Sequence, residues 1–114
     1  MMMQNYQCID VTESAEWLKH GACLVDIREP SIFKYQHAEG AVNLTSQTLA
    51  QFIADTDPER PILVMCYHGI SSKNAAEFIY NQGFKHVYSI DGGFNAWRSK
   101  YPETLVSDSG ADIV

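Results

Sequence analysis

The chain has 114 residues, of which 46% are hydrophobic and 19% are charged, so it has the size and composition of one folded globular domain and not of a disordered chain. Its formal net charge of −6 has the wrong sign for a protein that binds nucleic-acid phosphates or anionic lipid. We therefore predict a single domain over residues 1–114 that binds neither nucleic acid nor a membrane surface.

Short apolar runs alternate with amphipathic segments along the chain, a pattern typical of an α/β fold with a mainly parallel sheet covered by helices. The domain core is expected over about residues 7–101, and the polar last stretch predicts a flexible tail over residues 102–114. The predicted strands cover residues 7–9, 22–27, 41–44, 61–66 and 86–90, and the predicted helices cover residues 14–20, 30–35, 47–55, 71–82 and 94–99.

The apolar runs are too short to span a bilayer, and residues 1–5 lack the cationic start and long apolar stretch of a secretory signal. A cytoplasmic location is therefore expected. The three cysteines, Cys8, Cys23 and Cys66, include no C-x-x-C pair, which argues against a disulfide framework or a zinc site. At least one thiol is therefore free, and no metal is predicted.

Cys66 follows the most apolar predicted strand and precedes a polar loop that contains Gly69. In α/β proteins, the carboxyl ends of the strands are where ligands bind. Successive backbone N–H groups of the loop and the positive end of the following helix would favour an anion there and lower the pKa of the thiol. Free cysteines are often simply buried core residues, but the abrupt change from strand to glycine-bearing loop to helix favours Cys66 as a nucleophile.

The other polar residues near Cys66 have several possible roles. Ser71 or Ser72 is expected to cap the helix, which leaves the second hydroxyl free to bond a charged sulfur. Three roles are open for His68, namely a general base, a cation for an anionic substrate and a polar loop residue, and contact with an anion is favoured over the base. Asp26 and Arg28, at the end of a neighbouring predicted strand, are interpreted as a structural ion pair or a capping carboxylate.

Three separate motifs resemble the rhodanese family of sulfurtransferases, and together they cover nearly the whole chain. Residues 25–30 (VDIREP), with Phe33 and residues 37–43 (HAEGAVN), are similar to the family's N-terminal signature. Residues 66–71 (CYHGIS) resemble its active-site loop, and residues 91–97 (DGGFNAW) resemble its C-terminal signature. The short length and the loop sequence resemble in particular the single-domain thiosulfate sulfurtransferases of this family.

The resemblance implies a rhodanese-like single domain with a five-stranded, mainly parallel sheet flanked by helices on both faces. It also implies a thiosulfate:cyanide sulfurtransferase with a ping-pong mechanism, in which Cys66 takes the outer sulfur of thiosulfate as a persulfide and passes it to cyanide or to a thiol acceptor such as thioredoxin. No cofactor is required. The expected catalytic residue is Cys66, and the expected substrate-binding loop consists of Tyr67, His68, Gly69, Ile70, Ser71 and Ser72.

The loop departs from that of the larger rhodaneses, which carry cationic side chains in or near it. Here the loop has only Tyr67 and His68, and Lys73 lies just beyond it. This difference predicts weak thiosulfate binding and leaves open a different sulfane compound as the donor.

Alternative functions use the same fold. A sulfur-relay protein would deliver persulfide sulfur from Cys66 to a specific protein partner. A cysteine-dependent phosphatase or arsenate reductase would need an Arg six positions after the nucleophile, where Ser72 stands, and the six-residue loop has the sulfurtransferase length. A binding module without chemistry is disfavoured because such domains in this family commonly lack the loop cysteine.

Overall fold

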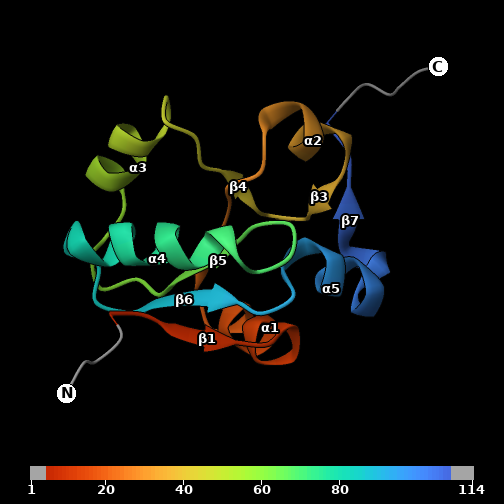
Figure 1. The fold of residues 1–114 in the computed structure, drawn as a ribbon, viewed down its shortest axis with the longest axis horizontal. Coiled ribbons are helices and arrows are strands. Elements are labelled where there is room, and N and C mark those ends of the chain that lie inside the picture. Colours follow the sequence, from red (N-terminus) through yellow and green to blue (C-terminus); the bar gives the residue numbers. More distant parts are fainter. Residues whose placement is uncertain (1–4, 109–114) are drawn as a thin grey trace.

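The computed structural model describes residues 5–108. Its main sheet has the strand order β1-β6-β5-β2-β4, and every neighbouring pair is parallel (Figure 1). The α/β fold with a five-stranded, mainly parallel sheet is therefore confirmed. The strands of this sheet are β1 (Gln7–Ile9), β2 (Cys23–Asp26), β4 (Val42–Asn43), β5 (Ile62–Met65) and β6 (Val87–Ile90).

Helices cover both faces of the sheet, as predicted, because the central strand β5 is apolar on both sides. Its residues Leu63 and Met65 pack in one core with α1 and α5, whereas Ile62 and Val64 pack in a second core with α3 and α4. All four side chains are fully buried. The helices are α1 (Val11–Lys19), α2 (Pro30–Tyr35), α3 (Leu49–Asp55), α4 (Ser71–Asn81) and α5 (Gly93–Lys100).

Helix α1 begins three residues before the predicted start at Ser14. The Asp10 side chain caps it, because its Oδ1 atom accepts the Glu13 backbone N–H at 2.8 Å. Ser14 instead lies inside the helix, where its hydroxyl donates to the Asp10 carbonyl at 2.8 Å. An Asp immediately before a helical segment is a common N-cap signal, so this boundary was visible in the sequence.

The prediction of a flexible tail from Pro102 is wrong for the first part of that segment. Residues Pro102–Thr104 form a short 3-10 helix (η1), and β7 (Leu105–Val106) pairs antiparallel with β3 (His37–Ala38). The Trp97 indole also donates to the Thr104 hydroxyl at 2.8 Å. These contacts bind the segment to the domain, whereas residues 109–114 lie outside the described residues. None of the helices in the described part of the chain is long and apolar enough to cross a membrane.

Candidate active site

Cys66 lies directly after β5, at the carboxyl end of the central strand and before the amino end of α4. The residue is 6% exposed. Its Sγ atom accepts the backbone N–H of Gly69 at 3.1 Å and that of Ser72 at 3.2 Å. The loop therefore wraps around the sulfur with its N–H groups directed inward, as expected for a site that stabilises an anion.

The surroundings of Cys66 favour the thiolate. Burial raises the pKa of this thiol, but hydrogen bonds from the Ser72 hydroxyl and from the backbone N–H groups of Ser72, Gly69 and His68 lower it by more than that, so the net pKa is lower than that of an ordinary cysteine. Cys23 lies within β2, and there burial outweighs the charge of Arg60 and raises the pKa. A thiolate is the nucleophilic form of cysteine, so the two cysteines differ in the property that matters for catalysis.

The prediction that Ser71 or Ser72 caps α4 is wrong. The N-cap position is Ile70, whose own side chain forms no capping hydrogen bond. The sulfur of Cys66 takes this role because it accepts the N–H of Ser72 in the first helical turn. The Ser72 hydroxyl is fully buried and forms a 2.7 Å hydrogen bond with the equally buried hydroxyl of Ser89 on β6.

Two glycines allow the loop to lie close to the turn between β6 and α5. Gly69 has φ +89°, and a Cβ there would lie 2.7 Å from the Gly92 nitrogen. Gly93 has φ +54°, and a Cβ there would meet the Cys66 carbonyl oxygen. Because no side chain intervenes, the N–H of Phe94 donates to the Cys66 carbonyl at 2.8 Å. The amino end of α5 therefore fixes the backbone of the loop that begins at Cys66.

A pocket of about 550 Å³ opens over Cys66. One wall comes from the loop itself, through Tyr67 and Ser71. A second wall comes from the segment between β2 and α2 and from α2 itself, a contribution that the sequence analysis missed. It lies here because the strand order places β2 beside β5, so the carboxyl ends of these parallel strands meet. The residues of this second wall are Ile27, Arg28, Glu29 and Ile32.

Arg28 and Asp26 form the structural ion pair that the sequence predicts. The Arg28 Nη2 atom lies 2.8 Å from Asp26 Oδ2, and the two side chains are 6% and 0% exposed. Arg28 Nη2 also donates to the Gln36 carbonyl at 2.8 Å, and the guanidinium carbon lies 3.8 Å from the centre of the Phe94 ring. The guanidinium therefore has its partners within the fold even though Arg28 lines the pocket.

The remaining residues of the predicted substrate-binding loop lie at different places. Tyr67 lines the pocket, and its hydroxyl accepts a hydrogen bond from Arg98 at 3.0 Å. His68 is exposed, stands edge-on to the Tyr67 ring at 4.4 Å and is not among the residues that line the pocket. Ile70 is 73% exposed and also lies outside the lining. Substrate binding by Ile70 and by His68 therefore stays a prediction.

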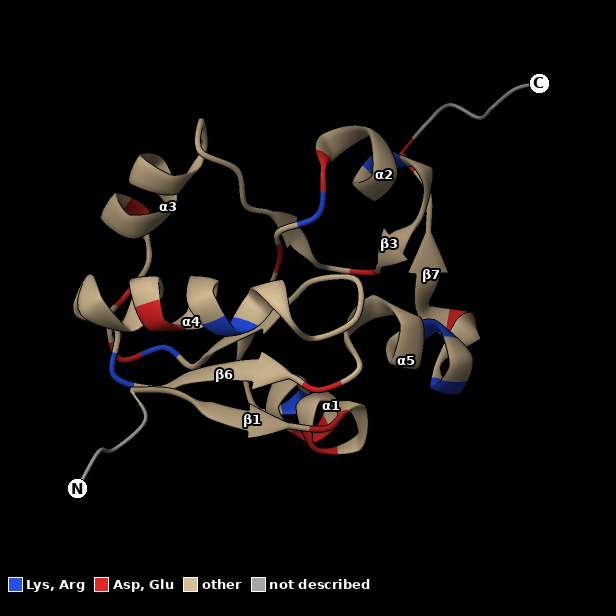
Figure 2. Cartoon of the chain, in the orientation of Figure 1, with Lys and Arg blue, Asp and Glu red and all other residues tan. Residues whose placement is uncertain are grey.

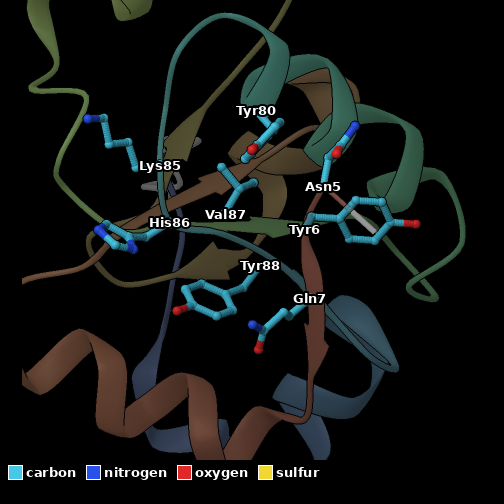
Figure 3. Close-up of a pocket in the computed structure, with 8 residues that line it drawn as sticks. All are labelled: Asn5, Tyr6, Gln7, Tyr80, Lys85, His86, Val87 and Tyr88. Carbon is cyan, nitrogen blue, oxygen red and sulfur yellow. The ribbon is translucent and has the colours of Figure 1, made fainter. Parts of the chain in front are cut away.

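Another hollow, of about 150 Å³, lies at the amino ends of β1 and β6, away from the catalytic loop (Figure 3). Its basic side chains already have a partner, because Lys85 and His86 lie 3.2 and 3.8 Å from the Glu59 carboxylate. In parallel sheets the carboxyl ends, not the amino ends, form the ligand site. Within residues 5–108, no cluster of His, Cys, Asp and Glu could hold a metal ion.

The Rhodanese-like domain family matches residues 2–100 of this chain. The chain therefore belongs to the rhodanese-like family, which supports a sulfurtransferase or a related cysteine-dependent activity.

Solved structures have the same fold. The reduced CoADR-RHD protein of Bacillus anthracis aligns with a TM-score of 0.76 and 24% identity over 90% of this chain, which spans only 18% of that longer protein. The polysulfide-sulfur transferase homodimer of Wolinella succinogenes aligns with a TM-score of 0.72 and 20% identity, over 96% of this chain and 84% of that one. A protein of unknown function from Rhodopseudomonas palustris, described as a possible tyrosine phosphatase, has a TM-score of 0.68 and 26% identity, over 83% and 81%.

Proposed function

We propose that this protein is a thiosulfate sulfurtransferase that carries sulfane sulfur as a persulfide on Cys66. One observation carries the proposal: a sulfur held by two backbone N–H groups, with a lowered pKa, lies at the base of an open pocket at the carboxyl end of the sheet. Nucleophilic catalysis needs such an activated thiolate with access for a donor.

In the first half-reaction, the Cys66 thiolate attacks the outer sulfur of thiosulfate. A bond forms between the two sulfur atoms, the sulfur–sulfur bond of thiosulfate breaks, and its electron pair leaves with sulfite. The N–H groups of Gly69 and Ser72, which hold the thiolate, are then in position to stabilise the persulfide anion. This half-reaction consumes and releases no proton.

In the second half-reaction, an acceptor takes the outer sulfur and regenerates the thiolate. Cyanide attacks that sulfur and leaves as thiocyanate, while a dithiol such as reduced thioredoxin takes it and can release sulfide as its own disulfide closes. A specific protein partner is the alternative acceptor. Large exposed side chains near the pocket support a protein acceptor, because Tyr67 is 39% and Ile70 73% exposed.

A phosphatase activity is less well supported. A phosphoryl group needs several hydrogen-bond donors around its oxygens, and cysteine phosphatases use an Arg six positions after the nucleophile for this. Ser72 occupies that position, is fully buried and is bonded to Ser89. Its short hydroxyl can reach the sulfur but has no charge to offer a phosphate.

Intact-protein mass spectrometry with thiosulfate tests the proposal on the wild type and on Cys66→Ser. Cys8→Ser is the matched control, because Cys8 is free and exposed. We expect the wild type and Cys8→Ser to gain one sulfur atom that cyanide removes as thiocyanate, and Cys66→Ser to gain none.

A wild type that gains no sulfur from thiosulfate or from other sulfane donors would contradict the proposal. Hydrolysis of p-nitrophenyl phosphate that depends on Cys66, without sulfur loading, would establish the phosphatase alternative. Sulfur loading followed by transfer only to one purified protein, and not to cyanide or small thiols, would support the relay alternative.

A further inference from the structure

Two backbone N–H groups of the loop are already occupied by the Cys66 sulfur. Gly69 and Ser72 donate to Sγ, so the part of a donor that leaves must lie outside this cradle, in the pocket above it. For thiosulfate, that part is a sulfite dianion. The charges and the polarity of the pocket wall therefore decide which leaving group fits.

The charged residues of the wall do not favour a dianion. Arg28 donates bidentately to Asp26, with contacts between 2.8 and 3.1 Å, and its side chain is only 6% exposed. Its positive charge is therefore balanced within the fold. Glu29 adds an exposed carboxylate to the same wall, and like charges repel an incoming dianion more strongly than a monoanion.

Two other cations near the loop do not line the pocket. Arg98 lies outside the lining and donates to the Tyr67 hydroxyl at 3.0 Å and to Asn95 Oδ1 at 3.2 Å. Lys73 is exposed on the first turn of α4 and is likewise not a lining residue. Figure 2 shows that Lys and Arg are spread over several elements of the fold.

The uncharged part of the wall is largely apolar. Ile27, directly after β2, and Ile32, on α2, line the pocket, and Tyr67 lines it from the loop. Ile32 is 50% exposed in the structure, so a ligand would remove apolar surface from water. The pocket of about 550 Å³ is within the range of small-molecule sites, roughly 300–1,000 Å³, and is larger than a bare sulfite needs.

We infer that the preferred donor of this sulfurtransferase is a singly charged sulfane compound whose leaving group carries an apolar carbon substituent that packs against Ile27, Ile32 and Tyr67. This inference rests on the proposed function and specifies its donor. An organic thiosulfonate, R–SO₂–S⁻, represents the class. The Cys66 thiolate bonds to its outer sulfur, the bond between that sulfur and the sulfonyl sulfur breaks, and the electron pair leaves with the sulfinate, R–SO₂⁻.

A series of three donors tests this inference on the wild-type protein: thiosulfate, methanethiosulfonate and benzenethiosulfonate. Thiosulfate and methanethiosulfonate differ by one charge, and methanethiosulfonate and benzenethiosulfonate differ by the size of the apolar group. Each kcat/KM for thiocyanate formation is divided by the rate constant of the uncatalysed reaction of the same donor with cyanide. A second correction uses the rate constant of the donor with N-acetylcysteine. Both divisions remove differences in the intrinsic reactivity of the donors. We expect the corrected values to rise along the series, with benzenethiosulfonate at least about tenfold above thiosulfate.

Two Lys substitutions locate the effect. Ile32→Lys places a cation on the pocket wall and should reduce the preference for benzenethiosulfonate by roughly threefold or more, mainly through better use of thiosulfate. Phe78→Lys is the control, because Phe78 is 46% exposed on α4 and does not line this pocket, and its preference should equal that of the wild type. Thermal unfolding of both variants checks that they fold.

The outcomes separate the inference from the proposed function. If all three donors load Cys66 but the corrected wild-type values are equal or favour thiosulfate, the inference is wrong and the sulfurtransferase proposal stands. If the preference changes equally in both Lys variants, net charge and not the pocket wall sets it, and the inference is again wrong. If no donor loads Cys66 in the mass-spectrometric assay, the proposed function itself fails.

Discussion

Replacement of Gly93 by Ala should disturb the loop that begins at Cys66 from a position outside it. Gly93 has φ +54°, and an added Cβ would meet the Cys66 carbonyl oxygen and lie 2.7 Å from that of Tyr67. These are the two carbonyls that accept N–H groups of α5, from Phe94 at 2.8 Å and from Asn95 at 3.0 Å. The substitution therefore forces α5 and the loop apart at the place where they are joined.

The magnitude follows from the conformation and the contacts. A left-handed conformation costs a residue with a Cβ about 1–2 kcal/mol, and loss of each backbone hydrogen bond costs about 0.5–1.5 kcal/mol. We therefore expect Gly93→Ala to lower the free energy of unfolding by about 2–5 kcal/mol. Gly40→Ala is the matched control, because Gly40 has φ +85° with no atom within 4 Å of an added Cβ, and it should lose only the conformational part.

Urea unfolding measures both variants, and the rate of Cys66 alkylation by iodoacetamide in the folded protein reports on the loop. Gly93→Ala should be less stable than Gly40→Ala and should alkylate Cys66 more slowly than the wild type at neutral pH, because a displaced loop no longer directs its N–H groups at the sulfur. Equal stability of the two variants, or an unchanged alkylation rate in Gly93→Ala, would refute the reasoning.

Further predictions concern the thiolate and the buried polar groups. Because folding lowers the pKa of Cys66, the thiolate stabilises the fold above the unfolded thiol pKa of about 8.5; from pH 6.5 to 9.5, urea unfolding should show the wild type gaining stability relative to Cys66→Ala, and a loss would contradict the lowered pKa. Ser89→Ala should slow Cys66 alkylation at neutral pH by about threefold, while Ser14→Ala, which also removes a fully buried hydroxyl, should leave the rate unchanged; equal rates in both would leave Ser89 with no effect on the thiolate. Asp26→Ala should cost about 3–5 kcal/mol in urea unfolding, because it leaves the buried Arg28 without its carboxylate, and a cost below 1 kcal/mol would show that the pair is not essential.

The alternation of strands and helices was predictable because the signals are local. The run before Cys66 is apolar at every position, and the structure buries all of β5 between two helical layers. Pro30 indicates the start of α2 for the same local reason, since its fixed φ suits the first helical turn. The position of Cys66 at a strand end was accessible in the same way, and it lies where the pattern predicts.

Predictions from local sequence were wrong for residues whose bonding partners lie far away in the chain. The position of Ser72 in the sequence predicts a helix cap, but in the fold its hydroxyl forms a hydrogen bond with Ser89, seventeen residues away. The polar composition after Pro102 predicts a flexible tail, but Leu105 lies opposite Ala38 in an antiparallel pair of strands. No local feature of the sequence predicts this pairing. Composition describes what a segment would do alone, whereas pairing with a distant segment supplies the energy that orders it.

Cys66 and the pocket wall beside it also differ in whether their surroundings are close in the sequence or only in the fold. A cysteine, a glycine-bearing loop and a helix start are consecutive in the chain, so the order of residues alone places a nucleophile among backbone N–H donors. The wall that faces it, with Ile27 and Ile32, exists only because β2 lies beside β5 in the sheet. The position of Cys66 among backbone N–H donors therefore follows from neighbours in sequence, whereas the apolar wall beside it follows from neighbours in space, because β2 and β5 are brought together only by the sheet.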